Sequence, residues 1–121
     1  MDNIKTWDDY CKINGDSMYF ETNELRETHI VWDGNDVPLW MRKKWVAEYR
    51  INKLKPYYGG CTDGVLEVYT VAKDNKGNLS KSTIIGDDML NDYTLCFRTA
   101  SYRDDFLKHN MDLVKDYLNI K

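Results

Sequence analysis

One cysteine stands in a glycine-rich stretch that could expose a nucleophile. Cys61 lies in segment 59–64 (GGCTDG), whose glycines favour an open turn. A catalytic cysteine needs a base, most often histidine, within hydrogen-bond distance. The two histidines are His29 and His109, and no motif ties either of them to Cys61. We therefore predict no catalytic residue and interpret Cys61 as a turn cysteine.

Adjacent aspartates could in principle share a metal ion or a proton. Neighbouring residues on a helix or strand point in different directions, so such pairs do not form a site by default. Asp87 and Asp88 fall in an expected loop and would need further oxygen ligands to hold a hard cation. The cysteines at 11, 61 and 96 are too widely spaced for a metal-binding pair. We predict no metal site and no cofactor.

The central part of the chain concentrates positive charge and aromatic residues. Residues 37–59 contain six bases and one acid, whereas residues 1–36 contain nine acids and three bases. On a helical wheel the central segment shows two apolar stripes, although a surface helix normally has one. Either the helix is enclosed within the fold, or one stripe meets a partner. The first stripe contains Trp40, Ala47, Ile51 and Leu54, and the second contains Met41, Trp45 and Tyr49.

The second stripe and its basic neighbours have the composition of a protein interface. Interfaces are enriched in Trp, Tyr, Met and Arg. An alternative is that the acidic N-terminal segment, with Phe20 and Trp32, covers the stripe. The residues that we predict to bind a partner are Met41, Arg42, Trp45, Tyr49 and Lys53.

Nucleic-acid binding is a competing interpretation of the same helix. Interleaved bases and aromatics could meet phosphates and stack on nucleobases. The acidic isoelectric point of about 5.3 weakens that interpretation. A phosphate-cradling loop is disfavoured, since Gly59 and Gly60 precede an expected strand rather than a helix.

Capping residues predict where the first two helices begin. Thr6 and Asp9 have the spacing of a capping box for a short opening helix. The central helix is expected to be capped by Asn35 or Asp36 and to stop before Pro56.

A third helix is predicted near the C-terminus, capped by Ser101 with Asp104 completing the box. Its apolar residues recur with helical spacing, which is typical of a helix packed on a sheet. They are Leu107, Met111, Val114 and Leu118, widened by Phe106, Leu113 and Tyr117.

Three strands are expected between the helices. Segments 65–72 and 79–85 are rich in β-branched residues and flank a loop in which Gly77 suits a positive φ. Segment 93–98 is the third strand, and residues 18–20 and 29–32 are candidates for shorter ones. The order predicts an α+β fold: one domain over 1–121, with a small antiparallel meander packed against the central and C-terminal helices.

Composition and patterning indicate a soluble protein. The chain is 42% hydrophobic and 31% charged, as in ordinary globular domains. Its first residues carry acids where a signal peptide needs bases, and no apolar run approaches the roughly 20 residues that span a bilayer. We expect a cytoplasmic location and no membrane association.

The segment LCFRTASYRDDFLKHNMDLVKDYLNI, residues 95–120, resembles the strand-and-helix ending of small proteins from phages and prophages of gut Bacteroidetes. The end of the central helix, Leu54-Lys55-Pro56, is also similar, but Tyr57 stands where those proteins commonly carry a tryptophan. The resemblance covers about half of the chain. It implies origin as a phage or mobile-element accessory protein in a bacterial host, and it implies no catalytic residue.

These observations predict a non-enzymatic protein that binds a host or phage protein and so inhibits a host system. Two alternatives stay open: a structural component of the virion, and a small nucleic-acid- or nucleotide-binding protein. The sequence leaves the identity of the partner and the oligomeric state open.

Overall fold

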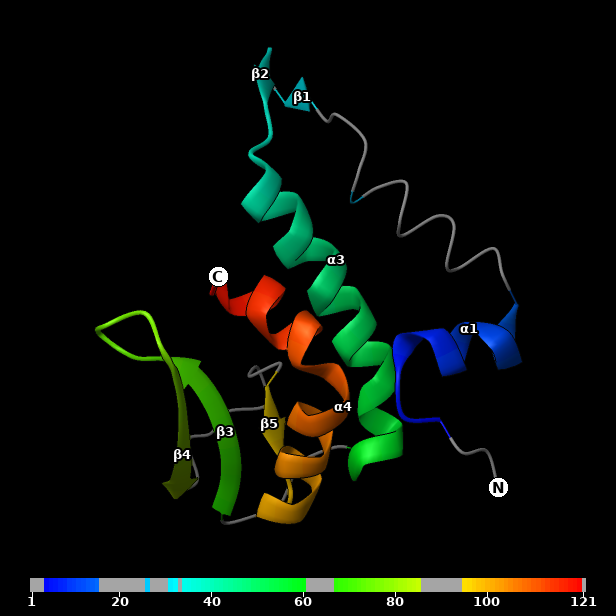
Figure 1. The fold of residues 1–121 in the computed structure, drawn as a ribbon, viewed down its shortest axis with the longest axis vertical. Helices are drawn as coiled ribbons and strands as arrows, with labels where there is room; N and C mark the ends of the chain where they lie inside the picture. The colour runs from blue at the N-terminus through cyan, green and yellow to red at the C-terminus, as the bar shows by residue number, and fades with distance from the viewer. Residues whose placement is uncertain are drawn as a thin grey trace.

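The computed structural model describes residues 4–15, 26, 31–32, 34–60, 67–85 and 95–120. It shows an α+β fold, as the sequence predicted, arranged in successive layers (Figure 1). A three-stranded antiparallel sheet is covered by the last helix, the central helix packs on the last helix, and the opening helix packs on the central one. The strand predicted at 18–20, the Cys61 turn and the acids at 87–88 lie outside the described residues.

Helix α1 spans Trp7–Asn14 and begins with the predicted capping box. The Thr6 hydroxyl accepts from the Asp9 backbone N–H at 3.2 Å, and the Asp9 carboxylate accepts from the Thr6 N–H at 3.1 Å. The helix buries Trp7 and Cys11, so one face of α1 is fixed against the body of the protein.

Helix α3 spans Leu39–Leu54, and the predicted cap at Asn35 or Asp36 is wrong. Those two residues form strand β2 (Asn35–Asp36), which pairs with β1 (Val31–Trp32) in a short hairpin. The N-cap is Pro38, which makes no side-chain capping bond. A local hairpin has here taken the expected capping residues into a strand, because Asn35 pairs with Trp32 and Asp36 pairs with Val31.

The end of α3 falls at Leu54, ahead of Pro56 as predicted, but the chain keeps turning. A 3-10 helix, η1, follows over Lys55–Tyr58 and ends at Gly59, whose φ is 94°. Proline is tolerated there because the first turn of a helix does not need its N–H. As a result Tyr58, which directly precedes the glycine-rich segment 59–64, is buried with 1% exposure.

The predicted hairpin is confirmed as β3 (Glu67–Lys73) and β4 (Leu79–Ile85). Gly77 in its loop has φ 84°. The third strand, β5, is shorter than expected at Cys96–Phe97, and it pairs with β3 rather than β4. The sheet order is therefore β4-β3-β5 and not a meander. Of the two long strands, β3 is the more deeply buried and takes the centre, whereas β4 is rich in Ser, Thr and Lys and suits an edge.

Helix α4 spans Ala100–Leu118, and its cap is Thr99, not Ser101. Thr99 is the last extended residue, with φ −137°, and its hydroxyl accepts from the Tyr102 N–H at 3.1 Å. Ser101 is already inside the helix. The backbone breaks once, at Asn110, where φ is −134° and ψ is 35°.

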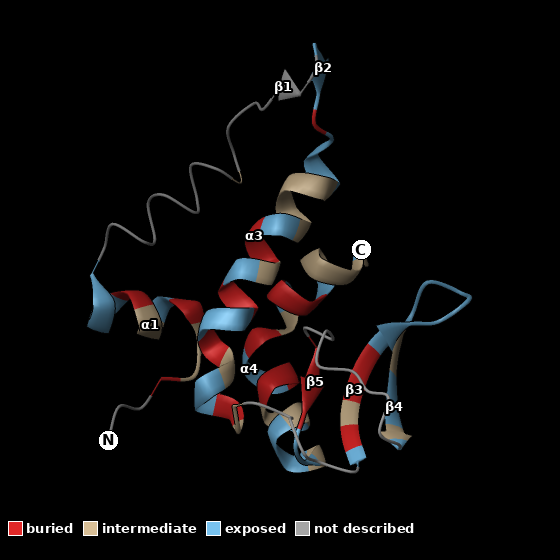
Figure 2. Cartoon of the chain, turned by 180° about the vertical axis from the view of Figure 1, so that it is seen from behind, coloured by how far each residue is buried: buried red, intermediate tan, exposed pale blue. Residues whose placement is uncertain are grey.

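The main core lies where α4 meets β3, β5, η1 and α3 (Figure 2). The predicted apolar stripe of α4 is confirmed, since Phe106, Leu107, Leu113 and Val114 are all buried. The side chains of the two residues of β5 point to opposite faces of the sheet. Phe97 joins the main core, and Cys96 packs with Val68 on the other side of the sheet.

The position of the α4 cap can be tested directly. Thr99→Ala removes the capping acceptor and is expected to lower the free energy of unfolding by about 1 kcal/mol. Ser101→Ala, the matched control, is expected to change it by less than about 0.5 kcal/mol because Ser101 is an exposed helical residue. Urea unfolding followed by circular dichroism measures both. Equal losses from the two variants would contradict Thr99 as the cap.

Candidate protein-binding surface

Residues of the first stripe anchor α3 in the fold. Ala47, Ile51 and Leu54 are buried in the main core, in the half of α3 that packs on α4. Trp40, predicted in the same stripe, is 45% exposed. The first turns of α3 extend past the packed region, so their apolar residues have no core to enter (Figure 1).

The second stripe remains on the surface. Met41 is half-buried, Trp45 is 40% exposed and Tyr49 is 41% exposed. The stripe is therefore not enclosed by the described residues. Large exposed aromatics at successive helical turns are unusual for a surface that meets only water.

Tyr49 differs from the other two because it contacts α1. Its ring lies edge-on to the ring of Trp7, with 6.0 Å between centroids and 75° between planes. The Lys53 ammonium lies 5.5 Å from the centroid of Tyr49. Tyr49 and Lys53 thus form an exposed aromatic–cation pair at the junction of α1 and α3.

Met41 and Trp45 line a hollow at the start of α3. The hollow has a volume of about 340 Å³. We call it the Trp45 hollow, and the residues that line it are Asn35, Asp36, Val37, Pro38, Met41 and Trp45. Because Asn35 and Asp36 belong to β2, the short β1–β2 hairpin supplies one wall and α3 the other. The space could receive one or two apolar side chains of another molecule.

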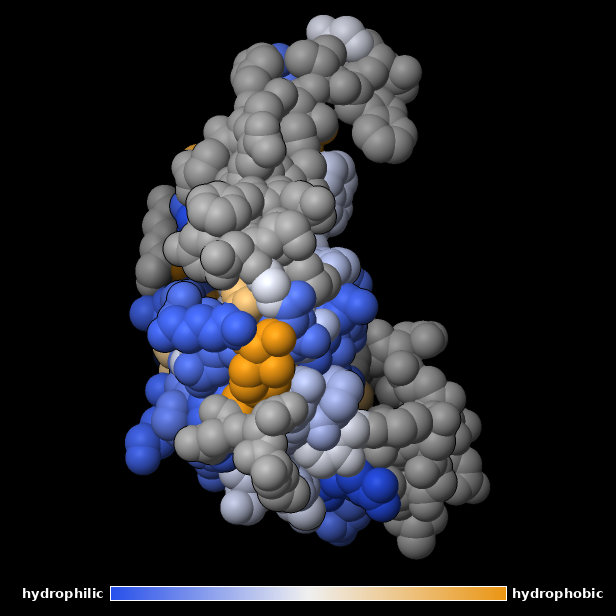
Figure 3. Space-filling view, turned by 90° about the vertical axis from the view of Figure 1, so that its right-hand side faces the viewer, coloured by the Kyte–Doolittle hydropathy of each residue, from blue (hydrophilic) through white to orange (hydrophobic). Residues whose placement is uncertain are grey.

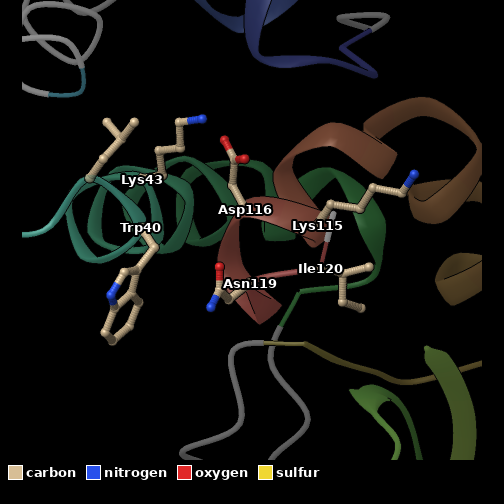
Figure 4. Close-up of a pocket in the computed structure, with 7 residues that line it drawn as sticks. Trp40, Lys43, Lys115, Asp116, Asn119 and Ile120 are labelled. Carbon is tan, nitrogen blue, oxygen red and sulfur yellow. The ribbon is translucent and has the colours of Figure 1, made fainter. Parts of the chain in front are cut away.

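A second hollow of about 240 Å³ lies where the start of α3 meets the end of α4. Trp40 and Lys43 come from α3, and Lys115 and Asp116 come from α4 (Figure 4). Two lysines on its rim give this hollow a more polar character than the Trp45 hollow.

Arg42 has an internal role. Its Nη1 donates to the Arg26 carbonyl at 3.0 Å, and its Nε donates to the Val37 carbonyl at 3.4 Å. Arg26 in turn pairs with Asp116 of α4 at 3.0 Å. Arg42 was predicted to bind a partner, but its guanidinium is bonded within the protein. One of these bonds holds Val37, which lines the Trp45 hollow.

Arg50, one of the six bases of residues 37–59, is buried with 8% exposure. Its guanidinium lies 5.3 Å from the centroid of Trp7. The docking of α1 covers this part of α3, and sequence periodicity could not anticipate a neighbour from a distant segment.

Helix α1 packs on α3 near Tyr49 and Arg50, and Figure 3 shows the face of the molecule on which α1 lies. A small strongly hydrophobic area, coloured orange, lies there between hydrophilic areas, coloured blue. Ile13 of α1, 52% exposed, is the kind of isolated apolar residue that needs no partner. This isolated residue is a useful control for the Trp45 hollow.

A buried polar cluster that the sequence did not predict joins the N-terminal segment to η1 and α4. Asn110 Nδ2 donates to the Lys5 carbonyl at 2.7 Å and to the Tyr58 hydroxyl at 3.3 Å. The Tyr58 hydroxyl also donates to the Lys5 carbonyl. An asparagine on the apolar side of a predicted helix was the available signal.

Burial within this cluster raises the pKa of Tyr58 to about 12, with the Asp105 carboxylate adding to the effect. The hydroxyl is therefore neutral in the folded protein. Its raised pKa contributes stability that is complete below about pH 10 and is lost as pH rises towards 12. The group acts as a structural hydrogen-bond donor at neutral pH.

A metal cluster and a membrane-spanning helix are both absent from the described part of the chain. No group of three or more potential metal ligands is close enough to hold an ion. None of the helices there has the length and apolar character needed to cross a bilayer.

Comparisons with protein-family models, with curated proteins and with solved structures found no match to this chain.

Proposed function

We propose that this protein is a non-enzymatic binding protein whose partner is a protein that docks on the start of α3. The observation that carries the proposal is the exposure of Trp45 beside a preformed hollow. Burying a tryptophan removes a large apolar area from water, and buried tryptophans are common interface hot spots. The second hollow is also lined by an exposed tryptophan, Trp40, but its rim carries Lys43, Lys115 and Asp116, whereas Trp45 faces a more apolar lining.

The charge of α3 favours an acidic partner. Residues 37–59 hold six bases and one acid. Two of those bases make contacts within the protein: Arg42 donates to the Arg26 carbonyl, and Arg50 lies over the Trp7 ring. Lys43 and Lys44 are half-exposed and Lys53 is exposed, which leaves a positive flank along the helix. The occupant that fits is a partner segment with an apolar anchor and acidic neighbours.

The resemblance of residues 95–120 to small proteins of phages and prophages indicates where such binding would take place. It implies an accessory protein of a phage or mobile element, acting in the cytoplasm of a bacterial host. Binding a host protein through the Trp45 hollow would inhibit the system to which that protein belongs.

The proposal is tested by comparing variants of the whole chain as bait. Wild type, Trp45→Ala and Ile13→Ala are immobilised and exposed to nuclease-treated host lysate. Proteins that bind wild type and Ile13→Ala but not Trp45→Ala are then purified and titrated directly against each variant. We expect Trp45→Ala to weaken the direct affinity about thirtyfold, as for an interface hot spot. Ile13→Ala is expected to leave the affinity unchanged.

Charge supplies an independent readout. A Lys43→Glu/Lys44→Glu variant should weaken the same complex, and affinity should fall as salt rises. The proposal is wrong if every captured protein binds Trp45→Ala as well as wild type. It is also wrong if binding depends on nucleic acid and disappears after nuclease treatment.

A further inference from the structure

The outer edge of the sheet presents a second surface, on the side of α4 away from α3 (Figure 1). In the order β4-β3-β5, β4 is an edge strand, and it pairs only with β3 among the described residues. It runs for seven residues, Leu79–Ile85, without proline or glycine. Long regular edges of this kind are templates for pairing with another strand.

The backbone groups that face outward can be identified from the ladder. Val71 N–H donates to the Leu95 carbonyl, so Val71 faces β5 and its neighbour Thr70 faces β4. Thr70 is opposite Ser82, so the backbone of Ser82 faces inward. Alternation then points the N–H and C=O groups of Leu79, Lys81, Thr83 and Ile85 towards the open edge.

The usual protection of such an edge is weakened here. Lysines commonly guard edges by projecting their charge into the space that a second strand would occupy. Lys81 is the only charged residue of β4, and its ammonium lies 3.0 Å from Asp104 of α4. The hydrogen bonds from Lys81 and Arg103 also hold the pKa of Asp104 below its usual value, so this carboxylate is ionised at neutral pH.

We propose that β4 pairs with β4 of a second copy of this chain, in antiparallel register about a two-fold axis at Ser82. In this register every outward backbone group of β4 finds a partner, whereas any shifted register leaves some unpaired. Leu79 lies opposite Ile85 of the second copy. This contact covers the Ile85 side chain, which is 71% exposed in the single chain. Lys81 lies opposite Thr83, so the like charges of the two copies are not paired.

The self-complementary pattern favours a second copy over an unrelated extended peptide. Each strand offers the same apolar residues at its ends and the same small polar residue at its centre, as an isologous interface requires. The product is one continuous sheet across two protomers. The Trp45 hollow is formed by α3 and β2 and takes no part in the pairing, so this inference does not depend on the proposed function.

Charge substitutions at Thr83 test the register. Thr83 is exposed, so Thr83→Lys and Thr83→Glu are both expected to fold. Thr83→Lys places a lysine opposite Lys81 of the other copy, twice per dimer, whereas Thr83→Glu places a carboxylate there. We expect the dimer dissociation constants of these two variants to differ by roughly tenfold, with Thr83→Lys the weaker. Sedimentation equilibrium measures the constants.

Cysteine cross-linking tests the position of the axis in a Cys61→Ser background. Ser82→Cys places two thiols opposite each other at a non-hydrogen-bonded pair about 4.5 Å apart between Cα atoms, close enough for a disulfide. Ser80→Cys is the matched control. Its two copies are offset by four residues, about 14 Å along the strand, and cannot be bridged.

We expect a disulfide-linked dimer from Ser82→Cys and none from Ser80→Cys under the same oxidising conditions. The inference is overturned if wild type remains monomeric at the highest soluble concentration, as it would if β4 received a peptide of another protein. Equal cross-linking of both variants would also overturn it.

Discussion

Phe106→Ala is expected to lower the free energy of unfolding by about 3–5 kcal/mol, the range for deletion of a large core aromatic. Phe106 is fully buried where three elements meet. Its ring centroid lies 5.0 Å from that of Tyr58 in η1 and 5.3 Å from that of Phe97 in β5. Alanine would leave a cavity that rigid neighbours on three sides cannot fill. The free energy of unfolding of a small domain is only about 5–15 kcal/mol in total, so this loss is a large share of it.

Urea unfolding followed by circular dichroism measures this loss. Tyr102→Ala is the matched control, since Tyr102 is an aromatic on the same helix but is 41% exposed. Its replacement is expected to cost less than about 1 kcal/mol. If the two variants lost the same stability, the placement of Phe106 at the centre of the core would be wrong.

Asn110→Asp is expected to destabilise the protein by about 3–5 kcal/mol at neutral pH, the cost of leaving a buried charge without a partner. The side chain is 2% exposed, and its Nδ2 donates to the Lys5 carbonyl and the Tyr58 hydroxyl. An aspartate has the same shape but cannot donate when ionised. It would turn a carboxylate oxygen towards the Lys5 carbonyl oxygen.

The pH dependence of Asn110→Asp separates the charge from the lost hydrogen bond. Burial would raise the pKa of this aspartate above its unfolded value of about 3.9. The folded state then binds the proton more tightly than the unfolded state, so the loss of stability shrinks as pH falls towards 4. The protonated carboxyl can donate to the Lys5 carbonyl, as the asparagine does.

Asn110→Leu is the control for this experiment, because it removes the donor without adding a titratable group. We expect it to cost about 1–2 kcal/mol relative to wild type, with no change in that difference between pH 4 and 7. Parallel urea titrations across this range compare the variants. A loss in Asn110→Asp that does not vary with pH would show that the side chain is solvated in the folded state.

Local features of the fold could be predicted because the interacting groups are close in sequence. The α1 capping box joins Thr6 to Asp9, and the β4 strand was predicted with its observed bounds of Leu79–Ile85. The apolar stripe of α4 follows from helical periodicity alone. In each case one short segment contains both the signal and the contact that it predicts.

The candidate site was only partly predictable. Periodicity identified Met41, Trp45 and Tyr49 as surplus apolar surface, and they are exposed to different degrees. It could not show that Arg42 bonds to the Arg26 carbonyl or that Arg50 lies over Trp7. Both contacts depend on which distant segment lies beside α3.

The sequence alone thus determined the α1 capping box, the β3–β4 hairpin and the apolar face of α4. These features depend on residues that are close in sequence, whose conformational preferences act without the rest of the chain. The pairing of β5 with β3 and the burial of Asn110 needed segments far apart in the sequence to meet. Several long-range pairings satisfy the same local pattern. The three-dimensional packing selects among them by how much apolar area it buries and how many buried polar groups it satisfies.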